Sequence, residues 1–495
     1  MEVGPGALGQ PVGAGSLNRV LRLWRRDRAA AAPRPERLSL LLFGVTGLVY
    51  LLSGKTFFGY DGEIMYRVSE SIVLRHSVQI ADPIYHFNEP YSPYAIGLSL
   101  LMLPFVAIGV AVLHDPRALV TLLEPTITAA TVVMLNLLLV ELGCSRKRSL
   151  LISLCYAFGT LAWYYSGVLF TEPVIALCLV GGVLSLRFYQ HRGEWRWLLI
   201  AGAVSGTAVL MRWDSMLLVA APMGLYGLVA IIRRPGAMRR RALELAVFGA
   251  PIIGAAAVNL AYDLFRFREA LGGPYKADAL GFSTPLPKGL LGLWLSPGVG
   301  VFVYTPILLM SVIAWRWFYQ RWPREALLIL GLFLLRSVFF GRYWAWEGGA
   351  TWGPRHLVPL IPLLLLPVAF LPRKRWVEVA AIALGIVGVM IQVLGQLVPY
   401  GLYYGTVVPQ LMAQLGYCQG CLPLPGLQSE AVNAITDFDL PYVPLVVQVR
   451  YLLNGVVAPA WGPISLVIPL LFGMVAYALE RVRRLAVALD AAADV

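Results

Sequence analysis

Two carboxylates directly follow the first hydrophobic segment of the chain. Asp61 and Glu63 lie between the aromatic residues Tyr60 and Tyr66, at the point where the chain should leave a membrane. Acidic side chains at that depth are costly and persist mainly where they pair, bind metal or do chemistry. A carboxylate held there can take a proton from a hydroxyl group, and a pair can hold a divalent cation such as Mg, Mn or Ca. The structural alternative for Asp61 is a helix N-cap, because an aspartate before a helix satisfies free N–H groups.

The composition of the 495-residue chain is that of a membrane protein. Hydrophobic residues make up 58% and charged residues 14%, and the mean hydropathy is +0.71, which excludes a soluble domain. Apolar runs of about 17–25 residues recur, which is long enough to cross a bilayer as helix. The net charge of +13 comes from short arginine clusters between these runs. Such clusters orient membrane helices, so we expect no nucleic-acid partner.

The apolar runs predict an all-α polytopic bundle of about 11–14 spans. Basic clusters such as 146–148, 233–241 and 373–375 mark the cytoplasmic side. The candidate spans are 38–54, 95–113, 118–142, 149–167, 173–189, 197–211, 214–232, 242–262, 299–315, 326–340, 357–371, 376–398 and 457–479.

The same alternation defines the outside loops. These are residues 55–94, 164–172, 263–298, 341–356 and 399–456. One step of the count conflicts with this scheme, because crossings at both 95–113 and 118–142 would leave the basic cluster 146–148 outside. Either a segment between residues 95 and 142 is re-entrant, or one span there is miscounted.

Four parts of the chain follow from this topology. Residues 1–37 are predicted to form a basic cytoplasmic tail, 38–398 the transmembrane core, 399–456 an outside loop, and 457–495 the last span with a cytoplasmic tail. The first outside loop has a helical pattern over residues 62–80, whose apolar stripe can lie on the membrane surface. We therefore expect surface helices in this loop.

A close cysteine pair lies in the outside loop 399–456. Cys418 and Cys421 are separated by only two residues, on the side where an oxidising compartment permits a disulfide, so we predict that they are bonded to each other. A zinc site would need two further ligands nearby, and none is evident.

A first span followed by a long outside loop that opens with an acidic motif resembles the GT-C superfamily of membrane glycosyltransferases. Its members include protein O-mannosyltransferases, aminoarabinose transferases of lipid A and arabinofuranosyltransferases. Residues 91–98 are similar to the Tyr-Ser-x-Tyr-Pro-Pro-Gly-x-Pro entry to the second span of many bacterial members, and Glu172 resembles their second acidic position. Segments 295–306 and 346–360 also resemble bacterial members. Many members carry adjacent acids, whereas Gly62 intervenes here, which leaves open whether Asp61 or Glu63 is the base.

The resemblance implies a sugar donor carried on a polyprenyl phosphate, and therefore cations for the leaving phosphate. Forked arginine donors suit phosphate oxygens, although arginines at a membrane edge are commonly anchors. The candidates for the phosphate site are Arg342, Arg355, His356 and Lys276, and simple solvent exposure is the alternative for the lysine. Candidates for contact with the sugar or the acceptor are Tyr60, Tyr91, Tyr94, His86, Glu347 and Trp352, with the membrane interface as the alternative for an aromatic residue.

The resemblance thus predicts an inverting glycosyltransferase with Asp61 as general base, and with Glu63 and Glu172 orienting the acceptor or holding a cation. The acceptor would be a hydroxyl of a glycan, lipid or protein on the outer face of the plasma (bacterial inner) membrane. We expect a monomer in contact with membrane lipids. A transporter or flippase of lipid-linked sugars is the alternative, and it would place charges in mid-span. A non-catalytic scaffold would show no convergence of acids and cations.

Overall fold

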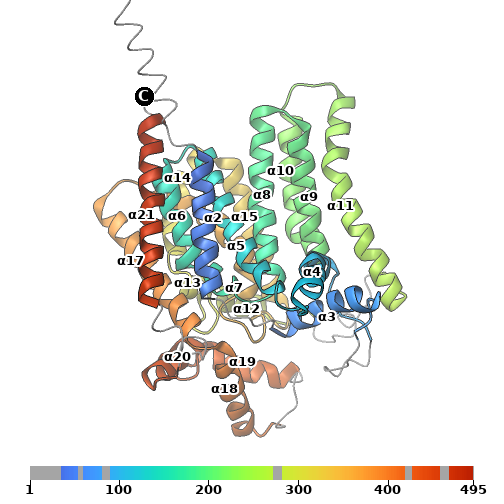
Figure 1. The fold of residues 1–495 in the computed structure, drawn as a ribbon, viewed down its shortest axis with the longest axis vertical. Coiled ribbons are helices and arrows are strands. Elements are labelled where there is room, and N and C mark those ends of the chain that lie inside the picture. The colour runs from blue at the N-terminus through green and yellow to red at the C-terminus, as the bar shows by residue number, and fades with distance from the viewer. Residues whose placement is uncertain are drawn as a thin grey trace, which may run out of the picture.

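The computed structural model describes residues 35–53, 59–80, 90–270, 281–417, 426–456 and 468–493. Within these ranges the chain is helical and contains no strand, which confirms the predicted all-α class. Figure 1 shows an upright helical bundle with α3, α12 and α18–α20 gathered at its lower end. We call this lower end the site end. The opposite end, where the arginine clusters at residues 146–148, 233–241 and 373–375 connect the upright helices, we call the basic end.

The upright helices run between these two ends and alternate in direction, except for α15 and α17, which run the same way because the helical turns of Arg355–Phe370 lead back between them. They are α2 (Pro35–Leu52), α5 (Leu123–Glu141), α6 (Arg146–Gly159), α8 (Thr171–Arg192), α9 (Trp195–Met211), α10 (Ala221–Ile232), α11 (Met238–Phe267), α14 (Leu308–Arg321), α15 (Pro323–Arg342), α17 (Arg375–Leu397) and α21 (Ile468–Ala493). Among the described helices, four are long and apolar enough to cross a membrane, namely Val120–Glu141, Thr171–Arg192, Met238–Phe267 and Arg375–Leu397. Shorter apolar helices accompany them.

Other helices and helical turns connect the upright ones or cover the site end. At the site end lie α3 (Gly59–Arg75), α4 (Gly97–Ile108), η1 (Gly109–Leu113), α12 (Leu286–Leu295), α18 (Tyr400–Gln414), α19 (Gly426–Phe438) and α20 (Pro444–Leu453). The remaining short turns are η2 (Val120–Leu122), α7 (Ala162–Tyr165), η3 (Met216–Ala220), α13 (Val301–Tyr304), η5 (Arg355–Leu360), α16 (Ile361–Leu364) and η6 (Leu366–Phe370).

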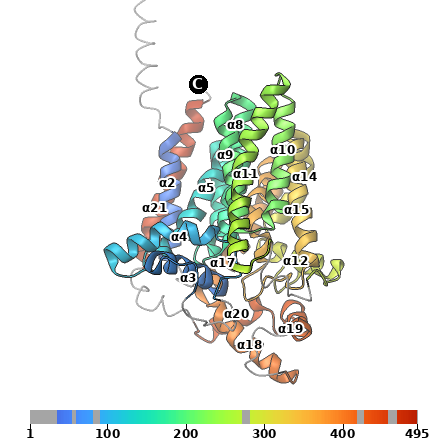
Figure 2. The same ribbon diagram turned by 90° about the vertical axis from the view of Figure 1, so that its right-hand side faces the viewer.

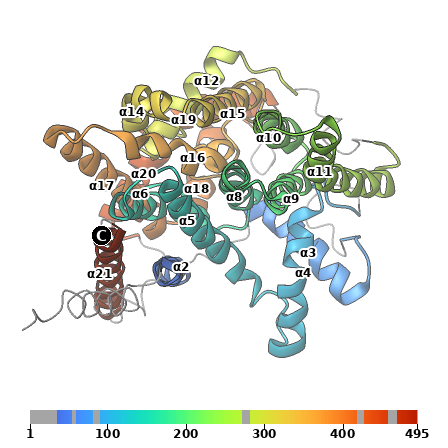
Figure 3. The ribbon, with the colours of Figure 1, turned by 90° about the horizontal axis from the view of Figure 1, so that it is seen from above.

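The predicted span at 95–113 is wrong, because α4 and η1 do not run along the bundle. Figures 2 and 3 show α4 lying across the ends of the upright helices beside α3. Two buried hydrogen bonds join these helices: the Ser69 hydroxyl donates to the Ser99 carbonyl and the Ser99 hydroxyl donates to the Met65 carbonyl, each at 2.8 Å. Only α5 then crosses between residues 95 and 142, and the conflict in the span count disappears.

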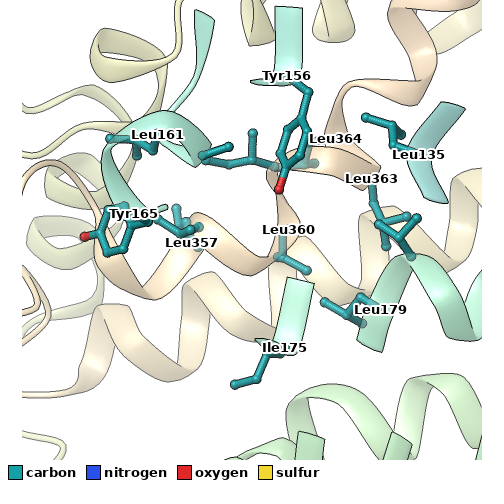
Figure 4. Packing of buried hydrophobic residues seen from close by; sticks show 14 of the residues in the cluster. Leu135, Tyr156, Leu161, Tyr165, Ile175, Leu179, Leu357, Leu360, Leu363 and Leu364 are labelled. Atoms are coloured by element: carbon teal, nitrogen blue, oxygen red, sulfur yellow. The ribbon is translucent and has the colours of Figure 1, made fainter. Parts of the chain in front are cut away.

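Close packing of helices distant in sequence forms the core. Figure 4 shows Tyr156 of α6 and the nearby Leu161 packed beside buried side chains of η5 and α16, among them Leu357 and Leu360. Lipid tails are as apolar as leucine, so close packing, rather than removal from water, holds such helices together. Glycine permits this approach: a Cβ at Gly388 of α17 would collide with the carbonyl oxygen of Gly159 in α6.

Candidate active site

An arginine that contacts two carboxylates lies at the centre of the site end. Arg355 donates from Nη2 to Asp61 Oδ2 at 2.5 Å and from Nε to Glu172 Oε1 at 2.8 Å. Glu172 is fully buried, and its guanidinium partner lies 4.2 Å from the ring centroid of Phe170. The structure thus brings together two predicted catalytic acids and one predicted phosphate-binding cation.

Gly62 in α3 and Pro173 in α8 explain how these two helices can begin at the site and place Asp61 and Glu172 there. Asp61 stands in the first turn of α3, and a Cβ on the next residue, Gly62, would collide with the carbonyl oxygen of Leu169. Helix α3 can therefore lie directly against the segment that leads into α8. Glu172 is in the first turn of α8 and precedes Pro173, whose missing N–H costs nothing so early in a helix. The close approach at Gly62 places the two acids beside the same arginine.

A hydroxyl group completes the environment of Asp61. Tyr94 donates to Asp61 Oδ1 at 2.6 Å, so both carboxylate oxygens accept a hydrogen bond. Burial alone would raise the pKa of Asp61, but the charge of Arg355 and the hydrogen bonds from Tyr94 and Arg355 outweigh it and hold the pKa below its ordinary value. Asp61 is therefore ionised at neutral pH.

Two further arginines extend this network, although neither was a predicted site residue. Arg212 contacts Glu172 Oε1 at 3.4 Å and Asp214 Oδ2 at 2.7 Å. Arg336 of α15 is fully buried and donates from Nε to the carbonyl of His356, while its two Nη atoms have no hydrogen-bond partner within the described ranges. The available signal was an arginine inside an apolar segment, which is costly without a function. Charge is balanced here, with Arg212, Arg336 and Arg355 facing Asp61, Glu172 and Asp214.

Glu63 has different partners from Asp61. It pairs with Arg67 at 2.8 Å and with Arg117 at 2.5 Å, and neither arginine contacts Asp61 among the described interactions. No group of three or more His, Cys, Asp or Glu side chains suited to a metal occurs in the part of the chain that the structure describes. Because both carboxylates are engaged by protein donors, this arrangement does not fit an ion shared by the pair. A divalent cation stays a prediction from the sequence.

The other predicted cations are placed differently from Arg355. Arg342 is exposed at the end of α15, and its carbonyl accepts from the backbone N–H of Thr284. His356 is buried and stacks on Phe340 with ring centroids 3.9 Å apart, while its Nε2 lies 3.2 Å from the carbonyl of Ala345. The imidazole thus lies one residue from Arg355 but packs against α15.

The remaining predicted sugar or acceptor contacts spread over the site end. Tyr60 is exposed at the start of α3, and Tyr91 accepts a hydrogen bond from Gln79 at 3.1 Å. Trp352 is fully buried between Tyr164 and Tyr304. The predicted residues His86, Lys276, Cys418 and Cys421 lie outside the described residues.

Glu347 forms a second pair of buried acids with Asp437 of α19, separate from Asp61 and Glu172. Its Oε1 accepts from Asn433 Nδ2 at 2.8 Å, while its Oε2 is buried without a partner among the described residues. Burial raises the pKa of Glu347 to about 7. Burial and then the charge of Glu347 also raise the pKa of Asp437, whose backbone carbonyl accepts from the Ser296 hydroxyl at 2.6 Å. The Glu347 side chain and the Asp437 backbone carbonyl thus join α19 to the core.

Comparison with known proteins agrees with the resemblance seen in the sequence. The family described as dolichyl-phosphate-mannose-protein mannosyltransferase matches residues 101–267, which include Glu172, Arg212 and Asp214. This match confirms the predicted resemblance to a family of membrane glycosyltransferases. A search of the curated proteins found no match.

Two solved structures are distantly similar over most of the chain. One is ArnT from Cupriavidus metallidurans bound to undecaprenyl phosphate, with 14% identity, coverage of 92% of this chain and 76% of that chain, and a TM-score of 0.46. The other is the archaeal oligosaccharyltransferase AglB from Archaeoglobus fulgidus, in complex with an inhibitory peptide and a dolichol-phosphate. It shows 11% identity, coverage of 83% of this chain and 55% of that chain, and a TM-score of 0.41.

Proposed function

We propose, from the similarity of residues 101–267 to the mannosyltransferase family, that this chain transfers a sugar from a polyprenyl-phosphate donor to an acceptor hydroxyl. The observation that carries the proposal is the position of Arg355 between Asp61 and Glu172. Such a transfer needs a base for the acceptor and a cation for the leaving phosphate, and here the two groups are already in contact.

In the proposed reaction, Asp61 acts as the general base. It accepts the proton of the acceptor hydroxyl while the hydroxyl oxygen forms a bond to the anomeric carbon of the sugar. The bond from that carbon to the phosphate oxygen breaks, and the polyprenyl phosphate leaves with the electron pair. Attack on the face opposite the phosphate inverts the anomeric configuration. The lowered pKa of Asp61 keeps the carboxylate ready to accept the proton at neutral pH.

Arg355 links the two halves of this reaction. Protonation of Asp61 removes one negative charge from beside the guanidinium, and the departing phosphate gains one in the same step. The positive charge of Arg355 is then no longer balanced by Asp61, and it stabilises the phosphate as that group becomes more anionic. Arg212 supplies a further donor, as do the Nη atoms of Arg336, which have no partner among the described residues, while Glu172 keeps Arg355 in place. No metal takes part in this proposal.

We place the reaction on the extracytoplasmic side of the plasma (bacterial inner) membrane. The site lies at the end of the bundle opposite the arginine clusters, and such clusters are retained on the cytoplasmic side. The acceptor would be a glycan, lipid or protein that reaches this surface.

A transfer assay with a panel of polyprenyl-phosphate sugars and the purified full-length chain tests the proposal. We expect at least one donor to be consumed with release of polyprenyl phosphate and inversion at the anomeric carbon, seen by NMR of the product. Arg355→Gln should abolish release without loss of the folded protein. Donor movement across vesicle membranes without release of polyprenyl phosphate would overturn the proposal in favour of a flippase.

A further inference from the structure

A large basic surface lies at the basic end, far from the site. It consists of two stretches: residues 191–197, which include the connection between α8 and α9, and residues 233–244, which include the connection between α10 and α11 and the first turns of α11. These two stretches hold seven arginines, which are Arg192, Arg196, Arg233, Arg234, Arg239, Arg240 and Arg241, against two acids, Glu194 and Glu244, a net charge of +5. We call these stretches the double-loop surface.

Internal contacts join the two stretches into one surface. Arg234 of the second connection donates to the carbonyls of Tyr189 and Gln190, at the end of α8, at 2.7 and 3.3 Å. Beside the first stretch, the ring of Phe188 in α8 lies 4.7 Å from the ring of Trp197, and the guanidinium of Arg192 lies 4.8 Å from the Phe188 ring centroid. The surface is therefore built by specific contacts.

Several of its cations have no acidic partner in the described part of the chain. Arg196 and Arg240 pair with Glu194 and Glu244, which uses both acids. Arg192, Arg233 and Arg239 are exposed, and no ion pair is formed by any of them with the described residues. Unpaired guanidinium groups attract phosphate, which they bind with forked donors.

Apolar side chains lie next to these cations along the flanks of α9 and α11. Trp195 is 62% exposed and Met238 75% exposed, and Ile200 and Leu243 continue the apolar faces toward the middle of the bundle. A soluble anion would not contact these apolar faces, whereas the acyl chains of a lipid would pack against them. A phospholipid combines both features, because its phosphate can lie near the arginines while its acyl chains lie along the two helices.

We propose that the double-loop surface binds an anionic phospholipid of the leaflet at the basic end. The lipid phosphate would contact Arg192, Arg233 and Arg239, and its acyl chains would lie against the exposed faces of α9 and α11. This site is separate from the proposed active site and does not depend on the proposed reaction.

Native mass spectrometry of the full-length chain, titrated with phosphatidylglycerol or phosphatidylcholine, tests this inference. The variant Arg192→Gln/Arg233→Gln/Arg239→Gln should bind phosphatidylglycerol on the order of 10²-fold more weakly, because each cation near an anionic lipid contributes about 1 kcal/mol. The matched control, Arg373→Gln/Lys374→Gln/Arg375→Gln, removes the same charge from the same end and should keep its affinity within roughly threefold.

Three results would overturn the proposal: unchanged binding by the first variant, equal loss in both variants, or displacement of the lipid by millimolar inorganic phosphate. Lysine at the same three positions should restore most of the binding, since the charge remains. This conservative variant separates loss of the lipid site from loss of the fold.

Discussion

At the scale of single residues, the contacts of the two neighbouring acids distinguish their roles. Asp61 contacts Arg355 and Tyr94, whereas Glu63 contacts Arg67 and Arg117. Asp61→Asn keeps the size of the side chain but removes its basicity, so we expect transfer to fall by ~10²–10⁴-fold while the protein stays folded. Initial rates of polyprenyl phosphate release check this. Glu63→Gln is the control and should retain most of the activity. A dead Glu63→Gln beside an active Asp61→Asn would move the base to Glu63.

Glu347 should make the stability of the protein depend on pH. Its folded-state pKa of about 7 lies above the ordinary value of 4.5, so the folded protein holds a proton that the unfolded chain releases. The stabilisation is complete below about pH 4.5 and decreases as pH rises to about 7, by an upper bound of about 3 kcal/mol.

Glu347→Gln should reduce this pH dependence, because the amide cannot ionise, and the part that burial of Asp437 contributes should remain. The measurement is hydrogen exchange of the α19 amides at pH 5 and pH 8, where the native protein should exchange faster at pH 8 after correction for intrinsic rates. Glu430→Gln alters an exposed acid of the same helix, paired with Lys288, and should retain the native pH dependence. Equal slopes in the native chain and in Glu347→Gln would contradict this account.

At the scale of elements, the packing of α3 against the start of α8 decides where Asp61 lies. Gly62→Ala introduces a methyl group against the Leu169 carbonyl, so α3 must move outward. We expect a loss of about 1–3 kcal/mol in stability, since overpacking of a close contact costs that much. We also expect a larger loss of activity than of folded protein, because the shift separates Asp61 from Arg355.

Gly331→Ala is the matched control for this substitution. Gly331 lies within α15, where a Cβ meets nothing within 4 Å, so alanine should be neutral or stabilise the helix by up to about 1 kcal/mol. Thermal unfolding and initial rates, measured for both variants, separate packing at the site from helix propensity. Normal transfer by Gly62→Ala would show that the close approach of α3 is not needed.

At the scale of the whole molecule, the two ends of the bundle should face different compartments. Leu74 of α3 and Trp195 at the start of α9 are both exposed and lie at opposite ends. In a cysteine-free background, Leu74→Cys should react in intact cells with a maleimide that cannot cross membranes, and Trp195→Cys should react only after the cells are opened. The reverse pattern would place the site on the cytoplasmic side.

The amino-acid sequence by itself determined the helical membrane class, the separation of arginine clusters from aromatic loops, and the candidate residues Asp61, Glu172 and Arg355. The class and the separation follow from local properties, since the length of an apolar run and the charge beside it act wherever the segment lies, whereas the resemblance to a known family selected Glu172 and the role of Arg355. Only the tertiary structure decided which candidates meet: Arg355 is 294 residues from Asp61 and 183 from Glu172 along the chain. It also decided that α4 lies across the bundle and that Arg336 reaches the site. Apolarity alone cannot distinguish a crossing helix from one held flat by two serine hydrogen bonds, and a buried arginine shows its purpose only through its neighbours.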